Sequence, residues 1–159
     1  MPESRLNDRV IVPTFHLPSR GHNVFDSSDL KRKKNLVLFF LTQPDSDFFL
    51  KAEEAYRVIK QENAELAVVC PLSIDQIEVF YRKNRLTFSI LADEDGGVFS
   101  KFISSEKGEP VAALFIMDKF AEVFFHYVEK DAGLLPPFED IIRSLNFIES
   151  QCPECQGGF

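Results

Sequence analysis

The chain has 159 residues, of which 45% are hydrophobic, with 17 Phe and no Trp, so it is long enough to bury a large, Phe-rich core. Its formal net charge of -7 argues against nucleic acid and against an anionic membrane surface as partners. No apolar run approaches the roughly 18 residues of a membrane span, and the first residues lack a secretory h-region, so we expect a soluble, cytoplasmic protein.

The N-terminal part predicts short extended segments. Residues 10–17 predict a short first strand that prolines interrupt, and Val24-Phe25 predict a brief return strand. A turn with Ser and Asp capping follows over 26–30. The basic run Lys31–Lys34 comes next, and we interpret it as a solvated turn rather than a phosphate-binding patch.

Residues 36–40 form a continuous apolar run, which is typical of a strand that is buried on both faces of a sheet. The polar residues 42–47 follow and carry strong helix-start chemistry. A helix is predicted from about 46 to 62, because Phe49, Ala52, Tyr56 and Ile59 fall on one face. Ligands of open α/β sheets bind beyond the carboxyl ends of strands, so residues 42–48 are where we expect an ancestral site.

The rest of the chain also alternates predicted strands with predicted helices. A buried strand is predicted over 66–70, and then a helix that Ser73 caps and that ends near Asn84. Residues 88–91 form a short segment, and 98–102 a short helix. The runs 111–117 and 121–128 predict a hairpin around Asp118-Lys119.

In the second hairpin strand, strict alternation places Phe124, His126 and Val128 on one face and Phe125 and Tyr127 on the other. The last helix opens after Pro136-Pro137, with Glu139 and Asp140 in its first turn, where negative charge suits the helix dipole.

This order of elements predicts the α/β class, and within it a thioredoxin-like three-layer sandwich with an N-terminal β extension. We expect a central mixed sheet with helices on both faces. One domain is predicted over residues 1–150, followed by a tail over 151–159.

Several segments resemble the peroxiredoxin (alkyl hydroperoxide reductase/thiol-specific antioxidant) family. They are Val12–Pro18, Ser28-Asp29-Leu30, Val68–Asp75, Phe88–Asp93 and Leu114–Asp118, and the similarity covers roughly residues 10–148. The resemblance implies a redox or antioxidant setting, a thiol-redox partner protein, and catalysis by a cysteine thiolate at the start of the helix after the central strand.

The sequence departs from that pattern at the expected site. The corresponding stretch, 44–49, has no Cys, and Val111-Ala112-Ala113 stand where the family places an Arg. Neither a carboxylate nor a hydroxyl can replace a thiolate toward a peroxide. We therefore predict a degenerate peroxidatic pocket at Thr42, Pro44, Asp45, Ser46 and Asp47.

For the polar residues Asp45, Ser46 and Asp47 two interpretations stay open. Their side chains cap the helix, or they line a pocket that binds a cation or a small polar ligand. We expect Cys70 to be a small core residue and His126 a hydrogen-bonded sheet residue. The pair Phe48-Phe49 is most simply part of the core. An exposed Phe48 would instead mark an interaction surface, with a homodimer as one expected assembly.

The tail contains Cys152-Pro153-Glu154-Cys155, a C-x-x-C motif with three open interpretations. The pair is a redox dithiol, and Cys152 and Cys155 are then the candidate catalytic residues. Alternatively it is half of a zinc site, which His126, His16, His22 or a second copy would complete. The third interpretation is a tail with spare thiols. No other cofactor is expected, so the predicted function is a degenerate redoxin with residual thiol–disulfide activity, or a non-catalytic binding or scaffold protein.

Overall fold

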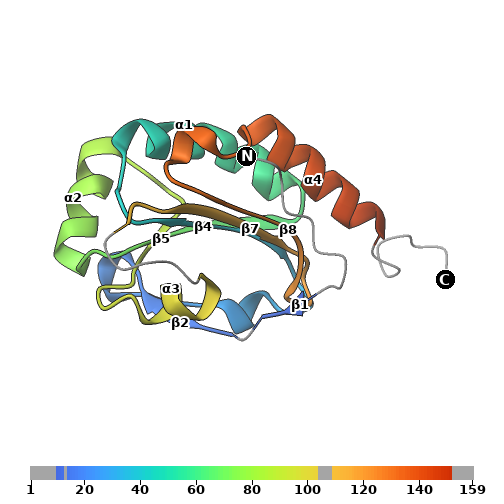
Figure 1. Ribbon diagram of the computed structural model, residues 1–159, viewed down its shortest axis with the longest axis horizontal. Helices are drawn as coiled ribbons and strands as arrows, with labels where there is room; N and C mark the ends of the chain where they lie inside the picture. Colours follow the sequence, from blue (N-terminus) through green and yellow to red (C-terminus); the bar gives the residue numbers. More distant parts are fainter. Residues whose placement is uncertain (1–9, 13, 104–108, 152–159) are drawn as a thin grey trace.

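The computed structural model describes residues 10–12, 14–103 and 109–151. A six-stranded mixed sheet forms the middle layer, in the order β1-β8-β7-β4-β5-β6, and β2 and β3 form a separate hairpin (Figure 1). The strands are β1 Val10–Ile11, β2 His16–Pro18, β3 Val24–Asp26, β4 Asn35–Leu41, β5 Ala64–Cys70, β6 Ser89–Ala92, β7 Ala112–Met117 and β8 Glu122–Glu129. The helices are α1 Ser46–Gln61, α2 Ile74–Asn84, α3 Gly97–Phe102 and α4 Phe138–Gln151, and three 3₁₀ turns are η1 Arg20–His22, η2 Ser27–Leu30 and η3 Ala132–Leu134.

The strand β4 lies in the middle of this sheet, and all seven of its residues are buried. It runs parallel to β5 and antiparallel to β7. The prediction of a strand that is buried on both faces is therefore confirmed, because a continuous apolar run has no side that tolerates water.

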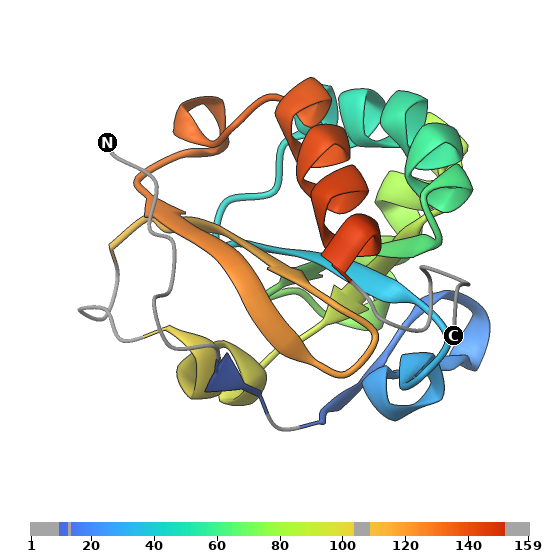
Figure 2. The ribbon, with the colours of Figure 1, turned by 90° about the vertical axis from the view of Figure 1, so that its right-hand side faces the viewer.

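Alternate side chains of β4 serve two different core layers. Val37, Phe39 and Leu41 pack with the apolar faces of α1, α2 and α4. Leu36, Leu38 and Phe40 pack with α3 and the β2–β3 hairpin on the opposite face. Figure 2 shows α1 and α4 together on one side of the sheet and α3 on the other. This is the three-layer arrangement that the sequence predicts.

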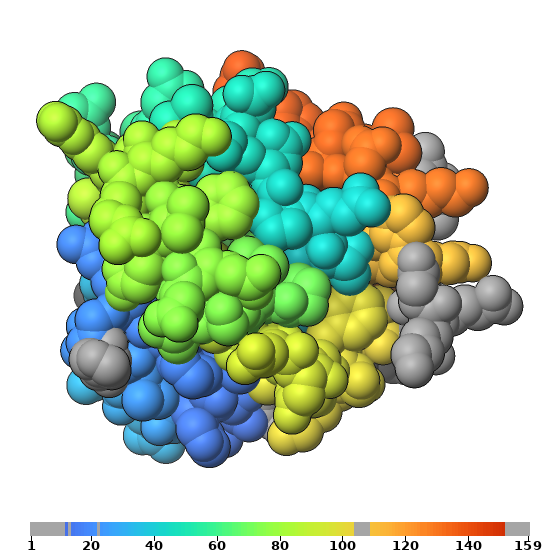
Figure 3. Space-filling model, turned by 90° about the vertical axis from the view of Figure 1, so that its left-hand side faces the viewer, coloured from blue at the N-terminus to red at the C-terminus, as the bar shows by residue number. Residues whose placement is uncertain are grey.

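The helices begin where the sequence places their caps. Ser73 and Gln76 form a reciprocal capping box at the start of α2, with Gln76 N–H donating to Ser73 Oγ and Ser73 N–H donating to Gln76 Oε1. The helix α2 ends at Asn84, and its C-cap residue Arg85 adopts a left-handed conformation. In Figure 3, α2 (green) covers one end of the molecule, next to α1 and above the blue part of the chain that precedes β4. No helix within the described ranges is long and apolar enough to cross a membrane.

Two sequence predictions about the strands are wrong. Residues 10–17 do not form one interrupted strand, because Val10–Ile11 pair with β8 while His16–Pro18 pair with β3 in a different sheet. Pro13 lies in the intervening segment and has no backbone N–H to donate to a ladder, which explains why the two segments do not form one strand.

The second correction concerns the faces of β8. A register shift between Ile116 and Met117 breaks the alternation, and Phe124 joins Tyr127 in the core layer of α1 and α4. Both Phe124 and Phe125 approach the ring of Phe147, at 6.4 and 6.1 Å between centroids. A period-two pattern does not signal an extra residue in one strand, so the sequence alone misassigned Phe124.

Candidate functional site

A hollow of about 360 Å³ lies at the carboxyl end of β4. Its walls come from the loop after β4, the start of β7 and the turn after β8, and its lining residues are Leu41, Thr42, Gln43, Pro44, Asp45, Val111, Ala112, Lys130, Asp131, Ala132 and Gly133. The hollow therefore occupies the edge of the sheet at which the sequence predicts an ancestral site.

Thr42 ties the loop to the neighbouring strand. Its Oγ1 accepts a hydrogen bond of 2.8 Å from the backbone N–H of Val111. The backbone N–H of Thr42 donates to the carbonyl oxygen of Val111 at 3.0 Å. Thr42 lines the hollow, but its hydroxyl is engaged in holding β4 to β7 rather than free for a ligand.

Asp45 is the N-cap of α1. Its side chain accepts a hydrogen bond of 2.9 Å from the backbone N–H of Asp47, and its carbonyl oxygen accepts one of 3.0 Å from Phe49. This is the capping geometry of the first sequence interpretation, worth about 1 kcal/mol to the helix. Ser46 and Asp47 lie in the first turn of α1 and are not among the lining residues of the hollow.

The opposite wall was not predicted from the sequence. Lys130 supplies a cation to the hollow, and Asp131 accepts a hydrogen bond of 2.8 Å from Gly133 N–H in the turn after β8. The strands β4 and β8 point in the same direction because each is antiparallel to β7. Their carboxyl ends thus lie at the same edge of the sheet. Knowledge of the strand order would therefore have placed Lys130 and Asp131 at this edge.

The hollow brings together a lysine, two carboxylates that already accept backbone hydrogen bonds, and a threonine hydroxyl. Within Leu41–Phe49 the sequence contains no thiol. These groups can bind a small polar molecule by hydrogen bonds and by the charge of Lys130. They provide no nucleophile with sulfur's reactivity.

Phe48 is not exposed, so its prediction as a core residue is confirmed, and the alternative of an interaction surface, which required an exposed Phe48, does not hold. Its side chain retains only 8% of its accessible area. The ring lies 4.9 Å from that of Phe39 and 5.8 Å from that of Phe138, between centroids. The sequence could not identify these partners, since Phe39 and Phe138 come from β4 and α4.

Cys70 ends β5 and is fully buried, as predicted. Burial raises the pKa of its thiol well above the ordinary value, because a thiolate would lose its hydration there. Cys70 therefore contributes no reactive thiolate to the hollow. The candidate residues Cys152 and Cys155 lie outside the described residues.

His126 differs from its prediction as a hydrogen-bonded residue. Its Nδ1 is buried and finds no hydrogen-bond partner in the described part of the chain. The imidazole stacks on Phe115, with ring centroids 5.7 Å apart and planes 11° from parallel. Loss of hydration lowers the pKa of His126.

The other two histidines lie elsewhere on the chain. His16 is exposed on β2, and the backbone of His22 ends the turn η1. Over the ranges that the structure describes, no three His, Cys, Asp or Glu side chains gather as metal ligands would.

A central mixed sheet with β4 between β5 and β7, covered by helices on both faces, defines a thioredoxin-like protein. The sequence profile of the AhpC/TSA family matches residues 9–125, and the chain belongs to this family. The resemblance stated from the sequence is thereby confirmed. No curated protein sequence matches the chain.

Solved structures of peroxiredoxins share the fold. Peroxidoxin BcpB from Mycobacterium tuberculosis superposes with a TM-score of 0.75 at 16% identity, covering 88% of this chain and 96% of that one. The mitochondrial 2-Cys peroxiredoxin from Plasmodium falciparum has the same TM-score at 15% identity, with coverages of 87% and 91%. Bacterioferritin comigratory protein from Xanthomonas campestris also gives 0.75, at 14% identity and coverages of 89% and 99%. At these identities the similarity establishes the fold.

Proposed function

We propose that this AhpC/TSA family protein has a degenerate peroxidatic site and that its thiol chemistry is a disulfide exchange carried by Cys152 and Cys155. One observation supports the first part above all others. The loop and helix start that border the hollow contain no Cys, and the one cysteine in the described chain, Cys70, is fully buried.

The chemistry of the hollow supports this proposal. Peroxide reduction needs an attacking thiolate that becomes a sulfenic acid and is later reduced. The Thr42 hydroxyl and the Asp45 carboxylate have no such reversible oxidation, and both are engaged with backbone groups. A peroxide that entered the hollow would therefore meet no group that can be oxidised and restored.

The proposed exchange uses the two tail thiols in sequence. One thiolate attacks a substrate disulfide, forms a mixed disulfide and releases one substrate thiol. The second cysteine then attacks the mixed disulfide, which closes a Cys152–Cys155 disulfide and releases the second thiol. An external dithiol, from a thiol-redox partner protein, returns the pair to the reduced form.

The pair would be a weak nucleophile. Thiols of fast oxidoreductases are placed at helix N-termini, which stabilise the thiolate. Cys152 instead directly follows Gln151, the last residue of α4. The C-terminal end of a helix carries partial negative charge and disfavours a thiolate. We therefore expect slow exchange rather than rapid turnover.

The test measures two reactions of the full chain: hydrogen peroxide consumption and reduction of insulin disulfides, each with dithiothreitol as the reductant. The variants are Cys152→Ser, Cys155→Ser, the double variant Cys152→Ser/Cys155→Ser and, as a matched control, Cys70→Ala. We expect no catalytic consumption of peroxide by any form, and insulin reduction that both tail substitutions abolish and Cys70→Ala preserves. Peroxide turnover that survives removal of both tail cysteines would refute the proposal.

The hollow favours one alternative function, that of a non-catalytic binding or scaffold protein. Lys130 and the surrounding loops remain as a lined hollow although the thiol is absent. A binding role predicts that neither tail substitution changes any measured activity. It also predicts that a Lys130→Ala variant loses ligand or partner binding, whether or not the protein forms a dimer. Wild-type insulin reduction that depends on Cys152 would count against it.

Zinc at the tail is the remaining alternative. Cys152 and Cys155 supply two ligands, and a second copy or a histidine would have to supply the others. Metal analysis of protein purified without chelators would show one zinc per chain, or one per two chains, if this alternative holds. Metal content that is unchanged in the Cys152→Ser variant would rule it out.

A further inference from the structure

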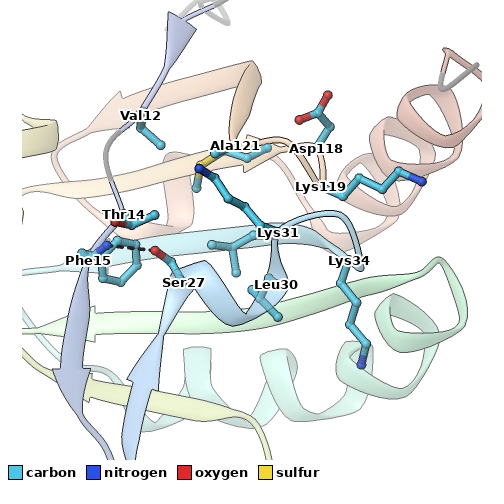
Figure 4. Close-up of a pocket in the computed structure, with 12 residues that line it drawn as sticks. Val12, Thr14, Phe15, Ser27, Leu30, Lys31, Lys34, Asp118, Lys119 and Ala121 are labelled. Atoms are coloured by element: carbon cyan, nitrogen blue, oxygen red, sulfur yellow. Dashed lines mark hydrogen bonds between the residues drawn. The ribbon is translucent and has the colours of Figure 1, made fainter.

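A second, smaller hollow lies at the amino end of β4, at the edge of the sheet opposite the candidate site. Its lining residues are Val12, Thr14, Phe15, Ser27, Leu30, Lys31, Lys34, Leu36, Met117, Asp118, Lys119 and Ala121 (Figure 4). The floor is apolar, because Leu36, Met117 and Ala121 meet there from β4 and the β7–β8 hairpin.

The size of this hollow decides what it can hold. Its volume is about 30 Å³. Sites for cofactors and drug-sized ligands measure about 300–1,000 Å³. The hollow therefore admits one small aliphatic group and excludes a nucleotide, a lipid chain or a cofactor.

The four consecutive cations Lys31, Arg32, Lys33 and Lys34, which we call the basic turn, reach the hollow through Lys31 and Lys34, which line it. All four are exposed. Arg32 adopts a left-handed backbone with φ of 66°, and its N–H donates a hydrogen bond of 2.7 Å to the carbonyl oxygen of Lys119. This bond holds the backbone of the basic turn against the β7–β8 hairpin, so the turn that carries the cations lies beside the apolar floor.

The basic turn has little internal charge compensation. Within the described ranges, no carboxylate forms an ion pair with Lys31, Arg32 or Lys33, and Lys34 approaches Glu65 only to 3.8 Å. Figure 4 shows the Lys31 side chain lying across the hollow, with its ammonium group over the floor, while Lys34 extends outward. A chain with a net charge of -7 thus keeps a cluster of available cations next to an apolar hollow.

We propose that the basic turn and this hollow form a docking surface for an acidic segment of a partner protein. One small aliphatic side chain of the segment enters the hollow, and its neighbouring carboxylates pair with Lys31 and the rest of the basic turn. Apolar anchoring and opposite charge together specify the occupant, since either feature alone gives weak recognition.

A nucleic acid fits this surface less well. Its bases are too large for a hollow of about 30 Å³. The surface is also remote from the candidate site along β4, since Leu36 and Leu41 line opposite hollows. The proposal is therefore independent of the proposed function.

The test uses a fluorescent peptide of sequence Ser-Glu-Asp-Leu-Asp-Glu-Ser as the probe, and fluorescence anisotropy with the full chain at low salt. The double variant Lys31→Glu/Lys33→Glu should bind the peptide about tenfold more weakly, because two charge pairs are reversed. The matched control Lys51→Glu/Lys83→Glu makes the same change in net charge at exposed positions on α1 and α2. It should change the affinity less than about twofold.

A second peptide tests the apolar anchor. Replacing its Leu by Ser should weaken binding about fivefold, because the aliphatic group no longer leaves water. Equal binding of the two peptides, or equal losses in the two double variants, would refute the proposal by showing non-specific attraction. Displacement of the peptide by a stoichiometric amount of a thymidine oligonucleotide would also refute it, by showing that the surface binds nucleic acid. The same holds if the protein forms a dimer that blocks peptide binding and that the Lys31→Glu/Lys33→Glu substitutions disrupt.

Discussion

Thr42 and Val111 are joined by three hydrogen bonds although they lie 69 residues apart. The Thr42 hydroxyl accepts from Val111 N–H at 2.8 Å and donates to the Val111 carbonyl oxygen at 3.2 Å, and the Thr42 N–H donates to the same oxygen at 3.0 Å. A side chain thereby extends the β4–β7 ladder one residue beyond the pair Leu41–Ala112. These hydrogen bonds hold the end of β4 against the start of β7, where both strands border the candidate hollow.

Removing the Thr42 hydroxyl should lower the free energy of unfolding. The variant Thr42→Val keeps the shape of the side chain but leaves Val111 N–H, in a residue that is only 6% exposed, without its partner. We expect a loss of about 1–3 kcal/mol in urea unfolding, the cost of an unsatisfied buried donor. Thr42→Ser retains the hydroxyl and should lose less than half as much. Equal stabilities of Thr42→Val and the wild type would contradict this account.

Truncation of Phe48 should lower the free energy of unfolding by far more than its position at the start of a helix suggests. Its ring packs against Phe39 and Phe138, so Phe48→Ala leaves a cavity between β4, α1 and α4. We expect a loss of about 3–5 kcal/mol. The matched control is Leu50→Ala, since Leu50 lies two residues further along α1 and is 45% exposed. It should cost about 0.5 kcal/mol or less, and a comparable loss from both variants in chemical unfolding would disprove the burial argument.

Phe48 also shows what the sequence could and could not predict. The apolar run of β4 and the helical spacing of Phe49, Ala52 and Tyr56 depend on local periodicity, and the structure confirms both. The burial of Phe48 depends on Phe138, which lies ninety positions away in the chain. A periodic pattern contains no information about that contact.

The candidate site also contains residues that the sequence predicts and residues that it does not. Thr42, Pro44 and Asp45 follow directly from the rule that sites lie beyond the carboxyl ends of strands. Lys130 and Asp131 complete the hollow only because β8 lies next to β7 and runs in the same direction as β4. That strand order is a tertiary property, so these two residues could not be assigned from their own surroundings in the sequence.

The accessibility of the three thiols can be separated by labelling. Cys70 is fully buried, and burial raises its pKa, so it should resist an aqueous thiol reagent in the native protein. A Cys152→Ser/Cys155→Ser variant should incorporate no label when folded and one label per chain in denaturant, by mass spectrometry. Rapid native labelling of this variant would mean that Cys70 reaches solvent, and the proposal that it contributes no chemistry would then fail.

His126 should make the stability of the protein depend on pH. Loss of hydration lowers its pKa in the folded chain below the ordinary value of 6.5, and its buried Nδ1 has no hydrogen-bond partner in the described residues. Below about pH 6.5 the unfolded chain therefore binds a proton that the folded chain resists. The contribution of His126 is fully present above that pH and is lost as the pH falls toward the lowered value.

The corresponding measurement is urea unfolding at about pH 7.5 and about pH 5.5, on either side of the ordinary histidine pKa. His126→Phe keeps a ring against Phe115 but cannot bind a proton, so its loss of stability on acidification should be smaller than that of the wild type. The difference should not exceed about 1.4 kcal/mol per pH unit, the limit for one proton. If His126→Phe instead retains the full pH dependence, carboxylates rather than this imidazole control it.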